Sequence, residues 1–268
     1  KITEDYSVME LEHGYIDGKK QVDRRDITSG KNIGKKNETT SYQQAVFEAK
    51  SLINKKLDDN YAYSISEIPK NSDGMFLPML AHSYDKHSKK IKFPCWVQPK
   101  LDGVRMLSKL FAKKEDGKVV LWSRKGKEIL TLSKIKEELA SVLDDGQSVD
   151  GEIYVHGWDF QRIVSAVKKE RDDTDLLEYH IYDSPDENKS FEERFLNSSL
   201  KEKISKTKRI KFVETKIVEN LNDMDLEEER CISLGYEGLM ARNKLSLYKF
   251  KNRSYDLQKV KRFEDEEF

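Results

Sequence analysis

The stretch Lys100-Leu101-Asp102-Gly103-Val104-Arg105 brings a lysine, a carboxylate, a glycine and an arginine together within six residues. A lysine amine becomes a nucleophile once it has lost its proton, and the fork of an arginine suits phosphate oxygens. The pair Asp102-Gly103 is also a strong signal for a hairpin turn between two strands. Both interpretations predict a rigidly held lysine at the end of a strand, and the first makes it a nucleophile that attacks a nucleotide phosphate.

The composition limits what the rest of the chain can be. Its 268 residues are enough for two domains. The 49 basic and 49 acidic residues balance, so affinity for nucleic acid would depend on local basic patches. No apolar run approaches the length of a membrane span, and the first residues show no signal-peptide pattern. Cys95 and Cys231 have no CxxC partner, which predicts buried, reduced thiols in an intracellular protein.

The first predicted domain covers residues 1–65. Strands are expected at 7–11 and 21–27. A helix is expected from Ser41, whose spacing from Gln44 fits a capping box. The apolar residues predicted to share one face of this helix are Tyr42, Ala45, Ala49 and Leu52.

A basic patch lies in the strands and loops of this domain. Between positions 19 and 36 only Asp23 and Asp26 oppose the basic residues Lys19, Lys20, Arg24, Arg25, Lys31, Lys35 and Lys36. Contact with nucleic-acid phosphates and a solvated loop face explain the patch equally well. The segment 29–40 and the helix after it resemble the WGR-type domain, a small module that adds DNA-binding surface to enzymes acting on broken DNA. The Trp-Gly-Arg signature itself is absent.

The second predicted domain covers residues 72–268 and mixes strands with helices. Strands at 96–101 and 104–111 are expected to form a hairpin, and 212–218 to form one strand. Further strands are expected at 118–123, 149–155 and 178–182, and helices at 133–143, 158–169 and 226–234. This order predicts an α+β fold of antiparallel sheets flanked by helices, not a doubly wound parallel sheet.

Five short patterns follow the lysine motif along the chain. The first is a basic turn, Ser123-Arg124-Lys125-Gly126-Lys127. Two patterns place a carboxylate beside a glycine, Asp150-Gly151-Glu152 and Glu237-Gly238-Leu239-Met240. The strand end Tyr179-His180-Ile181-Tyr182-Asp183 is aromatic, and Leu257-Gln258-Lys259-Val260-Lys261 carries two alternating lysines. Carboxylates can bind a hard cation, and an aromatic ring can stack on a purine. Each pattern alone also fits a hairpin tip, a solvated strand face or core packing.

Together and in this order, the motifs resemble the covalent nucleotidyltransferase superfamily, and most closely the ATP-dependent DNA ligases, from about Pro78 to Phe268. The resemblance implies an ATP-grasp-like adenylation domain that uses ATP with Mg²⁺ or Mn²⁺ to seal nicks in double-stranded DNA. It implies that Lys100 becomes adenylated and that Gln98 and Tyr182 hold the adenine. Arg105 would contact the ribose or the nick phosphate, and Glu152 and Glu237 would contact the ribose and the metal. Lys259 and Lys261 would bind the α-phosphate, and Arg124 and Lys125 would bind the DNA backbone. Lys125 and Tyr182 stand where asparagine and phenylalanine are common in the family.

An OB-fold domain with a basic motif normally follows the adenylation domain in this family. Nothing after Lys261 resembles it, which predicts slow self-adenylation and weak nick sealing by this chain. The end of the chain is instead rich in basic residues that are expected to face DNA or nucleotide: Arg242, Lys244, Lys249, Lys251, Arg253, Lys259, Lys261 and Arg262.

Other functions remain open. An RNA ligase or an mRNA-capping guanylyltransferase would use the same lysine chemistry. A non-catalytic DNA-binding protein could retain the fold, although binding alone would not require Lys100, Glu152, Glu237, Lys259 and Lys261 together. The compact size and the N-terminal module suggest a role in viral or phage DNA replication, repair or recombination. The chain is expected to act as a monomer, in the cytoplasm of a bacterial or virus-infected host or in the nucleus.

Overall fold

A computed structural model describes residues 6–58, 61–64, 77–111, 117–196 and 198–261. The chain divides into two compact units, Lys1–Lys70 and Asn71–Phe268. Within the described residues, no helix is both long enough and apolar enough to cross a membrane.

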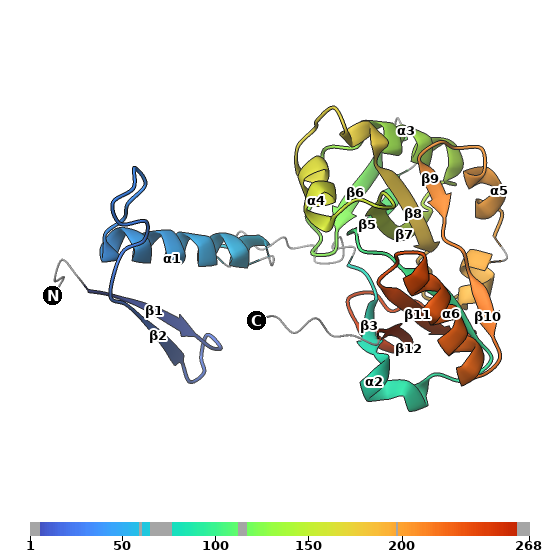
Figure 1. The fold of residues 1–268 in the computed structure, drawn as a ribbon, viewed down its shortest axis with the longest axis horizontal. Helices are drawn as coiled ribbons and strands as arrows, with labels where there is room; N and C mark the ends of the chain where they lie inside the picture. The colour runs from blue at the N-terminus through green and yellow to red at the C-terminus, as the bar shows by residue number, and fades with distance from the viewer. Residues whose placement is uncertain (1–5, 59–60, 65–76, 112–116, 197, 262–268) are drawn as a thin grey trace. The chain divides into compact units, whose positions relative to one another are not determined.

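The first unit consists of a two-stranded hairpin and one helix (Figure 1). Strand β1 (Ser7–His13) pairs antiparallel with β2 (Gln21–Ile27), and α1 (Ser41–Asp58) follows the basic loop, residues 28–40, which contains Lys31, Lys35 and Lys36. These three elements confirm the predicted strands and helix of this region.

The start and the buried face of α1 differ from the prediction. The capping box lies one residue earlier, because the Thr40 hydroxyl accepts a hydrogen bond from the Gln43 backbone N–H at 3.2 Å, and the Gln43 amide oxygen accepts one from the Thr40 N–H at 3.0 Å. Ala45 is buried, but Tyr42 is 55% and Leu52 37% exposed. The helix instead buries Ser41 and Gln44, polar residues that an apolar pattern does not reveal.

The second unit is built on two five-stranded sheets, both mostly antiparallel. The first sheet has the order β10 (Lys216–Val218), β4 (Cys95–Lys100), β11 (Gly238–Asn243), β12 (Arg253–Val260) and β3 (Leu80–Ser83). The second has the order β6 (Val119–Ser123), β5 (Val104–Leu110), β7 (Ser148–Tyr154), β8 (Glu178–Asp183) and β9 (Ile210–Phe212). The pairs β12–β3 and β8–β9 are parallel.

Helices pack on both sheets of this unit (Figure 1). On the first sheet, α6 (Leu221–Ser233) packs against β4, β10 and β11, and α2 (Tyr84–His87) against β3 and β12. On the second, α3 (Ser133–Val142), α4 (Phe160–Lys168) and α5 (Leu200–Ile204) pack against β6, β5 and β9, respectively. Short turns of 3₁₀ or π-helix lie at Ser88–Lys90, Thr174–Leu176 and Glu192–Leu196. This arrangement confirms the predicted α+β class.

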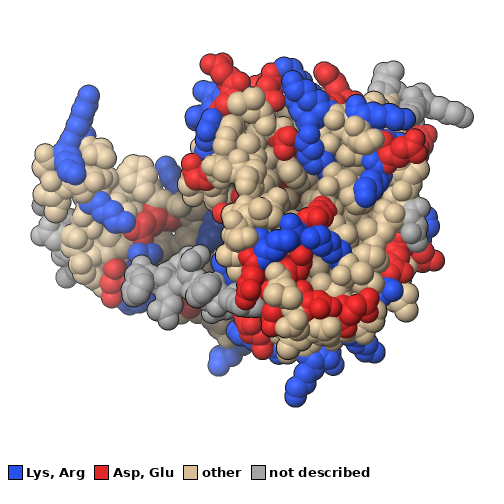
Figure 2. Space-filling view, turned by 45° about the vertical axis from the view of Figure 1, so that its right-hand side comes forward, with Lys and Arg blue, Asp and Glu red and all other residues tan. Residues whose placement is uncertain are grey.

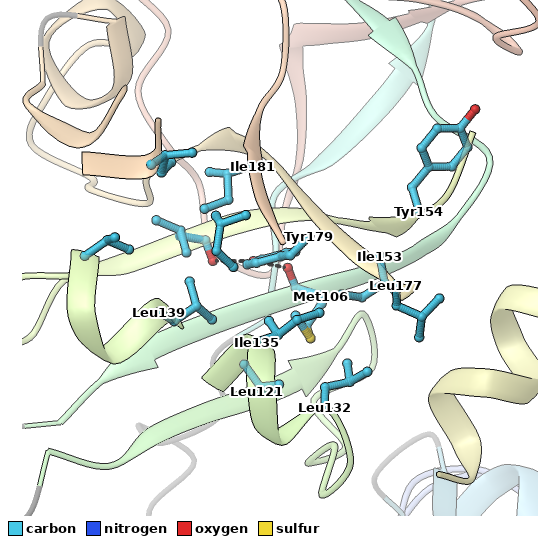
Figure 3. Close-up of a cluster of buried hydrophobic side chains, with 14 of the residues drawn as sticks. Met106, Leu121, Leu132, Ile135, Leu139, Ile153, Tyr154, Leu177, Tyr179 and Ile181 are labelled. Carbon is cyan, nitrogen blue, oxygen red and sulfur yellow. Dashed lines mark hydrogen bonds between the residues drawn. The ribbon is translucent and has the colours of Figure 1, made fainter. Parts of the chain in front are cut away.

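The larger core lies in the second sheet and its helices (Figure 3). Ile135 and Leu139 of α3 meet the fully buried Met106 and Tyr179 of the sheet. The Tyr179 hydroxyl donates a hydrogen bond to the Met106 carbonyl at 2.8 Å, so this buried polar group is satisfied (Figure 3). The Tyr179 hydroxyl also lies 3.2 Å from the carbonyl oxygen of Val149, the residue before Asp150, so the core helps to hold the strand that carries this motif.

Two strand predictions are wrong, both where the chain passes between the sheets. Strands β4 and β5 do not form a hairpin, because β4 lies in the first sheet and β5 in the second, joined by Leu101-Asp102-Gly103. The predicted strand 212–218 is divided into β9 and β10, again one in each sheet. Helix α6 also begins five residues before its predicted start, where the Asn220 side chain caps it by accepting from the Asp223 N–H at 3.0 Å.

Candidate active site

Lys100 is the last residue of β4, where the chain leaves the first sheet. It lies opposite Gly238 of β11, and its carbonyl accepts a hydrogen bond from the Glu237 N–H at 3.1 Å. The Lys100 ammonium contacts Glu237 Oε2, and Lys261 Nζ lies 2.9 Å from Glu237 Oε1. Burial opposes ionisation of Glu237, but hydrogen bonds from Lys100 and Lys261 outweigh it and lower the pKa of this carboxyl.

Glycines permit the close approach of these segments. Gly238 has a φ of +145°, and a Cβ there would lie 2.5 Å from the Val260 carbonyl oxygen. At Gly103 a Cβ would lie 2.3 Å from the Ile153 carbonyl oxygen and 2.8 Å from Cγ of Glu152. The glycine of the lysine motif thus serves the crossing between the two sheets, not a hairpin.

Beyond Lys100 lies a cavity of about 290 Å³ that both sheets line. Its lining includes seven of the predicted site residues: Gln98, Lys100, Arg105, Arg124, Glu152, Tyr182 and Lys259. Arg242 and Arg253 add two further cations to the lining. On the face drawn in Figure 2, basic side chains gather beside acidic ones around a hollow in this unit. The excess of lysine and arginine makes the cavity suited to a polyanion.

The predicted site residues outside this lining take different positions. Glu237 joins the site through its ion pair with Lys100, and Lys261 joins it through its own ion pair with Glu237. Lys125 is exposed in the turn after β6, next to Arg124. The structure thus brings Lys100, Glu237 and Lys261 together, and leaves Lys125 on the surface.

Glu152 and Tyr182 form the wall that the second sheet contributes. The Tyr182 hydroxyl donates a hydrogen bond to Glu152 Oε2 at 3.3 Å, and the Arg105 guanidinium lies 5.8 Å from the centre of the Tyr182 ring. Burial raises the pKa of Glu152 to about 8, and the charges of Arg105 and Lys100 offset this only in part. Burial likewise raises the pKa of Tyr182.

Buried charges behind this wall were not singled out by the sequence. Asp150, 1% exposed, accepts hydrogen bonds from Arg105 at 3.1 and 2.6 Å and from the Tyr248 hydroxyl at 2.6 Å. Asp183 accepts from Arg194 at 2.7 and 3.0 Å and from Arg242. Asp150 stands two residues before Glu152 and Asp183 directly after Tyr182, so the motifs contain both, but nothing in their spacing identifies their partners.

The predicted basic cluster at the end of the chain is partly neutralised. Arg242 is only 3% exposed and pairs with Asp183, so it is a buried residue and does not belong to an exposed basic surface. Lys244 lies 3.5 Å from Glu192, and Lys249 lies 3.7 Å from Asp256. Arg262 of this cluster lies outside the described residues.

Comparison with known proteins identifies the family to which this domain belongs. Residues 78–261 match the model of the ATP-dependent DNA ligase domain. The DNA ligase of African swine fever virus (strain Badajoz 1971 Vero-adapted) is 30% identical over 258 residues, which cover 90% of this chain and 58% of that protein. The DNA ligase of Enterobacteria phage T4 is 36% identical over 124 residues, which cover 43% of this chain and 23% of that protein. The chain thus spans little more than half of its viral relative.

Solved structures agree with the fold. The Chlorella virus DNA ligase-adenylate is 26% identical with a TM-score of 0.55, covering 71% of this chain and 70% of that one. A structure from a study of DNA binding by Lig E DNA ligases is 25% identical with a TM-score of 0.56, covering 70% and 69%. These findings confirm the resemblance drawn from the motifs. Because the matched domain spans more than half of its residues, the chain belongs to the ATP-dependent DNA ligase domain family.

Proposed function

We propose that this chain seals nicks in duplex DNA with ATP, through an intermediate in which AMP is bonded to Lys100. The observation that carries the proposal is the contact of Lys100 with Glu237, and of Glu237 with Lys261, beside a cavity rich in cations. The family supports the use of ATP and of DNA. The proposal includes a role in DNA replication or repair inside a cell, as a monomer; the relatives described above are DNA ligases of a virus and a phage.

The proposed reaction has three displacements, the first two at the α-phosphorus of ATP and the third at the phosphorus of the 5′-phosphate at the nick. The Lys100 amine forms a bond to the α-phosphorus of ATP while the bond to pyrophosphate breaks. A 5′-phosphate oxygen at the nick then takes the AMP from the lysine, and the neighbouring 3′-hydroxyl displaces AMP to close the strand. Lys259, Lys261 and Arg105 would hold the charge that spreads over the phosphoryl oxygens.

Glu237 has two tasks in this proposal. Before the nucleotide binds, it holds the Lys100 amine at the end of β4. When the triphosphate binds, it competes with Glu237 for Lys261, which lies 2.9 Å from the carboxylate. Lys261 would then contact the phosphates, and Glu237 would hold only Lys100, with its amine directed at the α-phosphorus.

A divalent cation, Mg²⁺ or Mn²⁺, fits this site as a companion of the nucleotide. Mg²⁺ commonly binds one or two carboxylates together with substrate phosphates. Among the described residues, no three His, Cys, Asp or Glu side chains are grouped to hold a metal. The ion would therefore rest on the nucleotide phosphates together with Glu152 or Glu237, and it would neutralise phosphate charge there.

The proposed contacts with DNA come from both units. Arg124, which lines the cavity, and the exposed Lys125 would hold the backbone near the nick. In the first unit, the basic loop would bind duplex phosphates in the manner of a WGR-like module. Two hydrogen bonds connect parts of this loop: Thr39 Oγ1 accepts from the Lys31 N–H at 2.9 Å, and Glu38 accepts from the Gly34 N–H at 2.8 Å.

The test of this proposal is covalent labelling. Incubation with α-³²P-ATP and Mg²⁺ should label the chain, and peptide mapping should place the label on Lys100. Lys100→Ala and Lys100→Arg should lower labelling by at least about a thousandfold, since the nucleophile is missing. Lys168→Ala removes an exposed lysine of α4 and should label normally. Labelling of Lys100→Ala at the parent level would refute the proposal.

The alternatives within the superfamily need a second comparison. A capping guanylyltransferase would label with α-³²P-GTP in preference to ATP, and an RNA ligase would act on nicked RNA in preference to nicked DNA. The proposal requires labelling with ATP and transfer of AMP to a nicked DNA duplex that carries a 5′-phosphate.

A further inference from the structure

Gln98 lies on β4 two residues before Lys100. It lines the cavity and is only 4% exposed. A glutamine amide has a donor end and an acceptor end. It can therefore accept a hydrogen bond from a base or donate one to it, depending on which end faces the base. An adenine offers an amino donor at the position where guanine offers a carbonyl acceptor. The orientation of this one amide therefore decides which base it favours.

The surroundings of Gln98 allow one orientation. Its Nε2 lies 3.1 Å from the Tyr182 carbonyl oxygen and 2.9 Å from Thr215 Oγ1. A carbonyl oxygen can only accept, so the NH₂ end must face Tyr182. The Thr215 hydroxyl donates its hydrogen to the Val213 carbonyl at 3.1 Å, so its oxygen is left to accept from Gln98. Both amide hydrogens are thereby used.

The remaining atom, Gln98 Oε1, is an acceptor. No described residue donates a hydrogen bond to it, and it is not among the side-chain atoms that are buried without a partner. It is available to a ligand in the cavity that Gln98 lines. The Tyr182 ring, the proposed stacking partner of the base, belongs to the residue whose carbonyl holds the amide.

We infer that Thr215 is a positioning residue that, together with the Tyr182 carbonyl, maintains the base preference of this pocket. It lies between β9 and β10, where the chain passes from one sheet to the other, and it acts through Gln98. With the hydroxyl in place, Gln98 offers an acceptor and favours a base that carries an amino donor, as in ATP, over one that carries a carbonyl, as in GTP. The inference rests on the proposed function, since it concerns the nucleotide of that same site.

Equilibrium binding of two analogues that cannot be cleaved at the α-phosphorus, α,β-methylene-ATP and α,β-methylene-GTP, separates this inference from the chemistry. Calorimetry should show that the parent chain prefers the ATP analogue. Thr215→Val removes the hydroxyl with little change of shape, so only the Tyr182 carbonyl still holds the Gln98 amide and its orientation is favoured less strongly. The preference should fall about tenfold, a difference of about 1.4 kcal/mol. Thr215→Ser keeps the hydroxyl and should keep the preference.

Thr131→Val is the matched control. Its hydroxyl donates to the Val167 carbonyl at 2.6 Å, and Thr131 does not line the cavity, so the preference should not change. If Thr215→Val does not fold, Thr215→Ala removes the same hydroxyl without adding a methyl group. An unchanged preference in the folded variant overturns the inference and leaves the proposed function standing. A parent chain that binds neither analogue overturns both.

Discussion

Glu152 lies in the cationic cavity, where Tyr182 donates a hydrogen bond to its carboxyl at 3.3 Å. Burial raises its pKa from 4.5 to about 8. Between those two pH values the folded chain holds a proton on Glu152 that the unfolded chain has lost. Stability therefore decreases as the pH rises through this window, because the unfolded state binds fewer protons there.

Replacing this carboxyl with an amide should remove that dependence. We expect Glu152→Gln to gain stability relative to the parent as the pH rises from about 5 to 9, by at least about 1.4 kcal/mol, the equivalent of one unit of pKa. Urea denaturation at both pH values measures it. Glu137→Gln, at an exposed position of α3, is the control. Parallel stability profiles for Glu152→Gln and the parent would contradict the assigned environment.

At the scale of single residues, the sequence predicts the role of a residue when the residues that define its motif are adjacent in the chain. Seven of the residues named from the motifs line one cavity, and Lys100 at the end of β4 and Glu152 beside Gly151 are examples of such local signals. Thr215 and Tyr248 were missed because their partners, Gln98 and Asp150, lie more than 90 positions away. No spacing within one motif reports a hydrogen bond made across two sheets.

The connection from β4 to β5 shows what a single element contributes to the site. A Cβ at Gly103 would lie 2.3 Å from a backbone oxygen of β7, which cannot turn away as a side chain can. We expect Gly103→Ala to displace this connection, to lower stability by about 1–3 kcal/mol and to reduce ATP labelling of Lys100 at least about tenfold. Chemical denaturation and labelling measure the two effects.

The matching control for this connection is Gly157→Ala. Gly157 has a φ of +82° with nothing within 4 Å of an added Cβ, so the substitution adds backbone strain without a steric overlap. It should cost some stability and leave labelling close to the parent level. If Gly103→Ala labels as well as Gly157→Ala, the close crossing is not needed to hold Lys100.

Elements defined by their own residues were predicted well, and pairings were not. The apolar spacing of Ile135, Leu139 and Val142 predicts α3, and all three are buried. The Asp102-Gly103 pair also predicts a turn, but a local signal cannot tell a hairpin from a crossing between sheets. That choice is made by β11, which pairs with β4, and by β7, which pairs with β5.

At the scale of the molecule, the chain combines a unit that contains Lys100 with a separate unit that contains a basic loop. Glu48 of α1 lies 3.1 Å from Arg25 of β2 and 3.6 Å from Lys31 of the loop, so part of the basic charge is neutralised. Lys35 and Lys36 are exposed. If the first unit binds duplex phosphates, these two lysines should carry much of the contact, whereas a solvated loop face would tolerate their loss.

Replacing both residues, in Lys35→Ala/Lys36→Ala, distinguishes the two interpretations of the loop. Each lost phosphate contact lowers the slope of log affinity against log salt by about 0.9. We therefore expect the slope for a nicked duplex to fall by about one to two units, with affinity at low salt reduced about tenfold or more. ATP labelling of Lys100 should be unaffected, because the loop and the cavity belong to different units. Lys50→Ala/Lys55→Ala removes the same charge from exposed positions of α1. An equal loss of DNA affinity in both double variants would mean that net charge, not the loop, supplies the binding.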